Sequence, residues 1–188
     1  MDSTRSPEEL SRFLSFLLRH HPEAVGVRLA VDGWVRIDDL LAGIAAHGAP
    51  LGRDALMEAV RTNAKRRFAV SPDGLRIRAS QGHRARSGVR LSGSLPPRAP
   101  PAILFHGTKG RLLAPIRRKG LLRMSREHVH LSASPEAAAA VGDRREGRTV
   151  VLTVDAAAMA RCGMLFRRSD NGVWLVGHVP PRYIRFRE

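Results

Sequence analysis

The stretch LSRFLSFLLRHHPE, Leu10 to Glu23, begins as an amphipathic helix and stops at a proline. Its apolar residues recur at helical spacing and form one stripe, Leu10, Phe13, Leu14, Leu17 and Leu18. Just upstream, Ser6 can cap the helix, Pro7 suits its first turn and Glu9 completes a capping box. The sequence therefore predicts a helix that starts after Ser6 and ends before Pro22.

The pair Arg19–His20 lies in the last turn of this helix. At about 100° per residue, Arg19 falls opposite Leu10 and points to solvent or to a ligand, while His20 lies beside Phe13 and Phe16 at the edge of the stripe. Cations in a last turn also complement the helix dipole, which would explain an isolated pair. A ligand site at Arg19–His20 is therefore favoured over the helix-dipole explanation only if other segments of the chain supply matching residues.

The composition points to a globular, strongly basic protein. Of 188 residues, 43% are apolar, and 32 Lys and Arg against 17 Asp and Glu give a formal charge of +15. Most of the excess is arginine, whose planar guanidinium suits phosphate, so nucleic acid or a phosphorylated ligand is favoured over a lipid surface. Neither a long apolar run nor a signal sequence is found, so we expect a cytoplasmic protein without a membrane partner.

Several classes of chemistry lack their sequence signatures. Cys162 is the only cysteine, which excludes an internal disulfide and a multi-cysteine zinc site, and we expect it to be a small buried residue. His128 and His130 share one face of an expected strand, but no acidic or cysteine cluster supplies further ligands, so no metal is expected. The common nucleotide-loop, zincin and hydrolase motifs are absent. Any catalytic chemistry is therefore expected to use histidine and arginine side chains.

The chain divides at an arginine-rich linker, residues 80–101, which contains Gly, Ser and Pro and no sustained apolar period. Before it, residues 1–79 predict a helix, a strand over 34–37, two further helices and a hairpin across Ser71–Gly74. The second helix is expected to be capped by Asp38 or Asp39 and ended by Gly48. This order is typical of a winged helix.

The lobe after the linker, residues 102–188, predicts mostly strands with small helices between them. Expected helices include one capped by Ser134 with Pro135 in its first turn, and one capped by Asp155. An Asn-Gly pair, Asn171–Gly172, predicts a late hairpin. The fold class is therefore α+β.

Four segments concentrate arginine and histidine: LLRHHP, KRRFAV, FHGTKG and MSREHVHLS. In FHGT a histidine lies at a strand end, next to a glycine that lets a ligand approach the backbone and a threonine that can donate a hydrogen bond. Each segment alone has a structural interpretation as well, such as a turn histidine or solvated arginines.

Together these segments resemble the NAD-dependent RNA (tRNA) 2′-phosphotransferase family. The resemblance covers nearly the whole chain, in order: LSRFLSFLLRHHPE, DGWVRIDDLL, KRRFAV, LFHGT, GLLRMSREHVHLS and NGVWLVGHVPPRYI. It implies an N-terminal winged-helix lobe that binds RNA, residues 1–79, and a C-terminal ADP-ribosyltransferase-like lobe rich in β-strands that binds NAD, residues 102–188, with a cleft between them.

The resemblance also implies roles for individual residues. The family's catalytic set matches Arg19, His20, Arg67 and Arg126. Arg66 lies beside Arg67, but the phenylalanine that follows fixes the register. The NAD-binding residues of the family match His106, Gly107, Thr108, His130 and Ser132. Arginines of the linker, Arg84, Arg86, Arg90 and Arg98, could add nonspecific RNA contacts or simply be solvated.

The activity that the resemblance implies is the removal of an internal RNA 2′-monophosphate by transfer to NAD, as in tRNA splicing. The reaction would pass through an RNA-2′-phospho-ADP-ribose intermediate and give 2′-OH RNA, ADP-ribose 1″,2″-cyclic phosphate and nicotinamide. NAD is consumed as a co-substrate without a metal, and we expect a monomer. Two alternatives remain: a nucleic-acid-binding regulator that senses NAD, and a transferase that ADP-ribosylates a phosphorylated nucleic-acid end and stops there.

Overall fold

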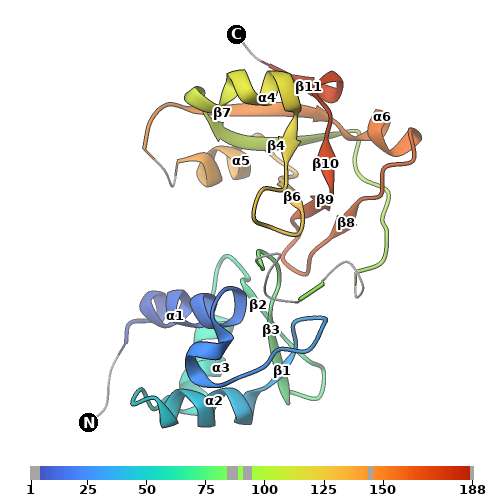
Figure 1. Ribbon diagram of the computed structural model, residues 1–188. Helices are drawn as coiled ribbons and strands as arrows, with labels where there is room; N and C mark the ends of the chain where they lie inside the picture. Colours follow the sequence, from blue (N-terminus) through green and yellow to red (C-terminus); the bar gives the residue numbers. More distant parts are fainter. Residues whose placement is uncertain (1–4, 84–88, 91–94, 144–145, 187–188) are drawn as a thin grey trace. The chain divides into compact units, whose positions relative to one another are not determined.

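The computed structural model describes residues 5–83, 89–90, 95–143 and 146–186 (Figure 1). The chain divides into two compact units, Met1–Ser94 and Leu95–Glu188. Both combine short helices with small antiparallel sheets, so the expected α+β class is confirmed. Within the described residues, no helix is long and apolar enough to cross a membrane.

Unit 1 packs three α-helices against a three-stranded antiparallel sheet in the order β1-β3-β2. Its elements are α1 (Pro7–Arg19), η1 (Pro22–Val25), β1 (Val35–Arg36), α2 (Ile37–Ala46), α3 (Arg53–Arg61), β2 (Phe68–Val70) and β3 (Arg76–Ala79). They enclose one apolar core, whose fully buried members include Leu14, Leu18, Ile37, Ile44, Leu56 and Ile77.

Helix α1 has the predicted start and the predicted buried stripe. The Ser6 side chain accepts from the Glu9 backbone N–H, and the Glu9 carboxylate accepts from the Ser6 backbone N–H at 2.9 Å, which completes the capping box. Of the predicted stripe, Phe13 is only partly buried. Ser11, which the stripe did not include, is 2% exposed.

The predicted hairpin is present as β2–β3, with Phe68 opposite Ala79 and Val70 opposite Ile77. The expected cap of α2 was wrong. Arg36 occupies the N-cap position without a side-chain hydrogen bond, and Asp38 and Asp39 lie in the first turn, where their charges still favour the helix dipole.

Unit 2 consists of three small sheets and the helices between their strands. The elements are β4 (Ile103–Lys109), η4 (Gly110–Leu112), α4 (Leu113–Lys119), β5 (Leu121–Leu122), β6 (Val129–Leu131), α5 (Pro135–Gly142), β7 (Thr149–Asp155), α6 (Ala156–Arg161), β8 (Arg167–Arg168), β9 (Trp174–Val176), β10 (His178–Val179), η5 (Pro181–Tyr183) and β11 (Ile184–Arg185). The sheet orders are β11-β7-β4, β6-β9-β8 and β10-β5.

The longest pairing in unit 2 joins β4 to β7 over all seven residues of each strand, from Ile103 opposite Asp155 to Lys109 opposite Thr149 (Figure 1). The predicted caps of the adjoining helices are present, because the Ser134 and Asp155 side chains accept from backbone N–H groups in the first turns of α5 and α6. Cys162, expected to be buried, is exposed at the end of α6.

The described parts of the predicted linker pack on the units that flank them. In unit 1, Arg90 donates its backbone N–H to the Val31 carbonyl at 2.6 Å. In unit 2, Arg98 donates its backbone N–H to the Phe166 carbonyl at 2.8 Å, and Pro97 bridges to β8. Of the linker arginines, Arg84 and Arg86 lie outside the described residues.

One helix glycine tests how closely unit 1 is packed. A Cβ added at Gly43, inside α2, would lie 2.4 Å from the Val25 carbonyl oxygen. Helix propensity alone favours Gly→Ala by about 1 kcal/mol, whereas forcing apart backbone that is already in contact costs about 1–3 kcal/mol. We therefore expect Gly43→Ala to lower the free energy of unfolding by up to about 2 kcal/mol in urea titrations.

The control is Gly177→Ala, outside the helices and without a positive φ, where an added Cβ meets nothing within 4 Å. This change is expected to stay within about 0.5 kcal/mol of the wild type. A Gly43→Ala variant that is more stable than the wild type would contradict the close packing of α2 on Val25.

Candidate functional site

Two histidines of unit 2 meet where β4 approaches β6. The backbones of Phe105 and Ser132 exchange two hydrogen bonds, of 2.9 and 2.8 Å, which bring the loop after β6 against the free edge of β4. His106 Nδ1 lies 3.0 Å from the His130 carbonyl oxygen. The two candidate histidines, 24 residues apart in the chain, are therefore joined through the backbone.

The contact between His106 and His130 fixes the chemistry of the His106 imidazole. A carbonyl oxygen only accepts, so Nδ1 carries the proton and Nε2 keeps the lone pair when the ring is neutral. Burial lowers the pKa of His106, the His130 carbonyl opposes this, and the charge of Arg126 lowers it further. At neutral pH the ring is therefore a neutral acceptor at Nε2.

Arg126 lies in the exposed loop that leads into β6, where its backbone N–H donates to the Arg123 carbonyl at 3.0 Å. Its Nη1 lies 3.4 Å from His130 Nδ1, an arrangement in which the imidazole nitrogen accepts. The structure thus brings Arg126, His130 and His106 together as a cationic group beside two imidazoles.

The other residues predicted to bind the cofactor lie on the same elements. Gly107 has a clear packing reason, because a Cβ there would lie 1.8 Å from the Ala138 carbonyl oxygen of α5. Side chains alternate along β4, so Leu104, His106 and Thr108 face away from α5, and Thr108 is 6% exposed. Ser132 is partly buried beside Phe105.

Three predicted catalytic residues lie in unit 1, two of them at the end of α1. Arg19 is the last residue of the helix and His20 its C-cap, whose backbone N–H donates to the Phe16 carbonyl. The Arg19 side chain packs against Gly82, where an added Cβ would lie 3.5 Å from Nη1. Phe16, expected beside His20, stacks on His21 with ring centroids 4.7 Å apart.

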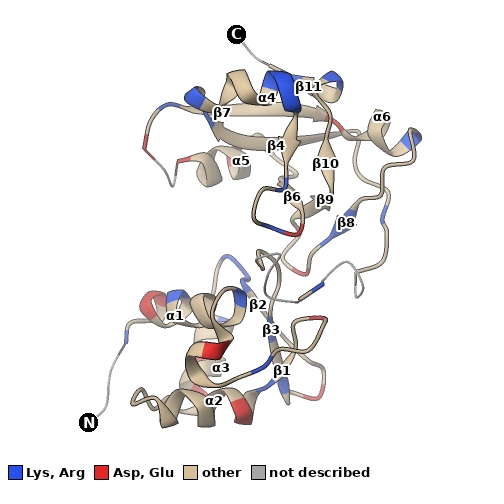
Figure 2. Cartoon of the chain, in the orientation of Figure 1, with Lys and Arg blue, Asp and Glu red and all other residues tan. Residues whose placement is uncertain are grey.

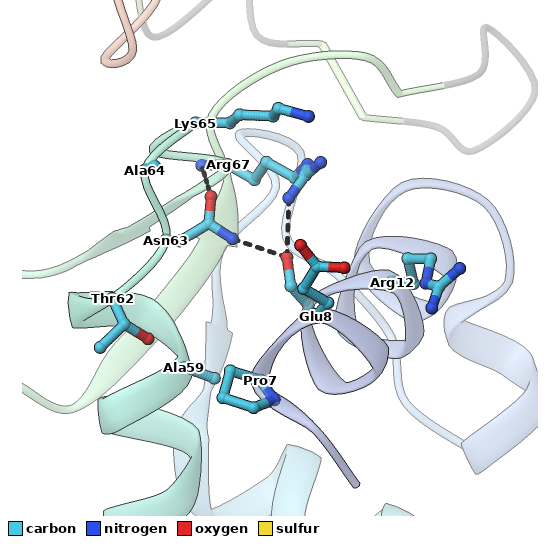
Figure 3. Close-up of a pocket in the computed structure, with 10 residues that line it drawn as sticks. Pro7, Glu8, Arg12, Ala59, Thr62, Asn63, Ala64, Lys65 and Arg67 are labelled. Carbon is cyan, nitrogen blue, oxygen red and sulfur yellow. Dashed lines mark hydrogen bonds between the residues drawn. The ribbon is translucent and has the colours of Figure 1, made fainter. Parts of the chain in front are cut away.

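The third residue, Arg67, lines a pocket of about 340 Å³ between α1 and the end of α3 (Figure 3). Its Nη1 donates to Ser11 Oγ at 3.0 Å, and its backbone N–H donates to Asn63 Oδ1 at 3.1 Å. Arg67 is partly buried, whereas the neighbouring Arg66 is exposed and has a φ of 41°. Of the two arginines, the one that the phenylalanine register selects is thus the one that lines this pocket.

The sequence is similar to known proteins along nearly its whole length. Residues 5–178 match the family described as RNA 2′-phosphotransferase, Tpt1 / KptA family. The chain belongs to this family. Relatives named "Probable RNA 2′-phosphotransferase" include proteins of Pseudomonas paraeruginosa, 51% identical over 178 residues, and Streptomyces coelicolor, 53% identical over 178 residues. These alignments cover 95% of this chain and 96% and 94% of the two relatives.

The charge of this Tpt1 / KptA family member is carried by both units. Figure 2 shows lysine and arginine on the elements of each unit, and the last turn of α4 alone contains Arg117, Arg118 and Lys119. The described residues hold no group of three or more His, Cys, Asp and Glu side chains that could bind a metal ion. His128 is buried beside Glu127, with Nδ1 and Oε2 3.8 Å apart.

Two residues that contact Arg67, Ser11 and Asn63, were not predicted from the sequence. Ser11 reads as a polar interruption on α1, and Asn63 as a helix-terminating residue after α3. Their partner Arg67 is 56 and 4 residues away in the chain, and Ser11 and Asn63 are separated by 52. At about 100° per residue Ser11 falls beside Leu14 and Leu18, so a polar residue within the apolar stripe was the signal that could have drawn attention to it.

The environment of His106 predicts how it titrates. Its pKa lies below the ordinary value of 6.5, so the unfolded chain binds more protons than the folded chain as the pH falls through that value. The contribution of His106 to stability is thus complete above about pH 6.5 and is lost as the pH falls toward the lowered folded pKa. NMR titration of the His106 Cε1 proton should give a midpoint below the ordinary value of 6.5, and an equal or higher midpoint would contradict the assignment.

Proposed function

We propose that this chain is an NAD-dependent RNA 2′-phosphotransferase that removes an internal 2′-monophosphate from RNA. The observation that carries the proposal is the family match over residues 5–178, which spans both units. The relatives' name supports the RNA substrate. The residues around Arg67 in unit 1 support binding of phosphate, and those around His106 in unit 2 support binding of a hydroxyl-rich co-substrate.

Each unit has a proposed role. Unit 1, in which a helix, a short strand, two helices and a hairpin follow one another, would act as a winged-helix lobe that binds RNA. Unit 2 would act as an ADP-ribosyltransferase-like lobe that binds NAD, built on the β4–β7 pairing. The net charge of +15 favours a polyanionic substrate.

The neutral acceptor of His106 fits the NAD that the family resemblance implies. Ribose hydroxyl groups are donors, and a neutral imidazole with Nδ1 held by a backbone carbonyl offers Nε2 as a fixed acceptor. His130, Thr108, Gly107 and Ser132 lie on the same strand pair and would complete this binding surface. NAD would supply an electrophilic ribose carbon with nicotinamide as its leaving group.

The proposed reaction has two steps with balanced bonds. In the first, an oxygen of the RNA 2′-phosphate attacks the nicotinamide-bearing ribose carbon, the carbon–nitrogen bond breaks and nicotinamide leaves. In the second, the ribose 2″-hydroxyl of the RNA-2′-phospho-ADP-ribose attacks phosphorus and loses its proton, while the RNA 2′-oxygen leaves and gains one. The products are 2′-OH RNA and ADP-ribose 1″,2″-cyclic phosphate.

The catalytic arginines and His20 have different proposed roles in these steps. Both steps gather negative charge on one phosphate, and guanidinium groups are always-ionised donors for its oxygens, which is the role proposed for Arg19, Arg67 and Arg126. The RNA 2′-oxygen that leaves in the second step needs a proton or a stabilising contact, and an imidazole suits this. We assign that role to His20.

The test uses the purified chain and a short RNA that carries one internal 2′-phosphate, with and without NAD and without added metal. We expect loss of the phosphate only with NAD, together with release of the cyclic ADP-ribose phosphate. Binding of RNA without turnover would favour a regulator. A lasting ADP-ribosylated product would favour a transferase that stops after the first step.

The assigned role of His20 predicts an unequal effect on the two steps. His20→Ala should slow the second step by about 10²–10⁴-fold, the range for loss of a general acid or base, and slow the first step less. The ADP-ribosylated RNA should therefore accumulate and be seen on a denaturing gel. His21→Ala is the matched control and should leave the two steps in their normal ratio, while equal slowing of both steps by His20→Ala would contradict the assignment.

A further inference from the structure

A closed set of hydrogen bonds holds Arg67 from two directions (Figure 3). The Arg67 backbone N–H donates to Asn63 Oδ1 at 3.1 Å, Asn63 Nδ2 donates to Ser11 Oγ at 2.6 Å, and Arg67 Nη1 donates to the same Ser11 oxygen at 3.0 Å. The ring therefore begins and ends on Arg67. We call Ser11, Asn63 and Arg67 the arginine ring.

The chemistry of each group fixes its orientation in the arginine ring. The backbone N–H of Arg67 can only donate, so the oxygen of the Asn63 amide faces Arg67 and its nitrogen faces Ser11. The Ser11 oxygen has two acceptor sites, and the two donors fill them. Ser11 is 2% exposed, so water does not readily compete with these two donors for its oxygen.

The arginine ring also restricts a side chain that is otherwise flexible. An arginine loses about 2 kcal/mol of rotamer entropy when it is fixed, and this cost is met in advance if protein groups already hold the guanidinium. A serine hydroxyl is neutral, so it holds one N–H without cancelling the positive charge that a phosphate requires. Arg67 lines the same pocket as Lys65 and Arg12, and Lys65 extends in the same direction in Figure 3.

We propose that Ser11 and Asn63 are positioning residues that hold the Arg67 guanidinium in the orientation needed for phosphate transfer. This inference rests on the proposed function, because Arg67 is there assigned to the phosphate. Ser11 and Asn63 act through Arg67 and need not touch the substrate. Misplacing a charge-stabilising donor by about 1 Å can cost up to 10²-fold in rate.

The first test replaces the shared acceptor. Ser11→Ala should lower the single-turnover rate of 2′-phosphate transfer about 10- to 100-fold. Ser15→Ala is the matched control, because Ser15 lies one turn later on α1 and within the described residues its Oγ is buried without a hydrogen-bond partner. That variant should transfer phosphate at the wild-type rate. Urea unfolding of each variant verifies that the fold persists.

A pair of nearly isosteric side chains then isolates the oxygen from the effect of volume. Ser11→Thr adds a methyl group to this buried position and keeps the hydroxyl acceptor, whereas Ser11→Val adds the same methyl group and replaces the hydroxyl by a second one. The threonine variant should be at least fivefold faster than the valine variant at similar stability. Equal rates for these two variants would show that Ser11 supports only the packing of α1.

The second test asks whether Ser11 acts through Arg67. Arg67→Lys keeps the charge but loses the fork that donates to Ser11. In this background Ser11→Ala should change the rate less than twofold, so the two substitutions are not additive. An equal loss in both backgrounds would overturn the inference.

The two proposals fail in different ways. A wild-type chain that does not transfer the 2′-phosphate would overturn the proposed function and the role of the arginine ring together. An active wild type whose Ser11→Ala variant keeps its full rate would overturn the role of the arginine ring alone.

Discussion

The antiparallel pairing of β4 with β7 is the constraint on which unit 2 depends. Seven consecutive residue pairs fix the register, so His106 faces away from α5 and Gly107 faces the backbone of that helix. The edge of β4 that does not pair with β7 binds the backbone of Ser132. A shift of one residue would turn His106 toward α5 and separate it from the His130 carbonyl.

In each unit, backbone groups or neutral side chains orient the polar side chains that are candidate site residues. In unit 2 a carbonyl determines which nitrogen of His106 carries the proton, and burial keeps the ring neutral. In unit 1 a serine hydroxyl and an asparagine amide direct Arg67. These two neutral partners do not themselves cancel the charge of Arg67, which suits a protein whose proposed substrate carries several phosphates.

Much of the local structure could be predicted from the sequence, because its causes are local. The capping box at Ser6, the caps at Ser134 and Asp155, and the β2–β3 hairpin all depend on residues a few positions apart. The N-cap of α2 could not be predicted, because Asp38 and Asp39 were equally suitable by residue type, whereas Arg36 occupies the N-cap position. Nor could the Ser11 contacts of the arginine ring or the packing reason for Gly107 be predicted, because they join residues 31 to 56 positions apart.

The central proposal for unit 2 is that His106 and His130 form a single NAD-binding site. The most direct measurement follows the imidazole Cε1 resonances of both histidines by NMR as NAD is added, with His47 of unit 1 as an internal reference. The account predicts that the His106 and His130 signals move together along one saturable binding curve while His47 stays in place. Saturable NAD binding that leaves both histidine signals unchanged would contradict it.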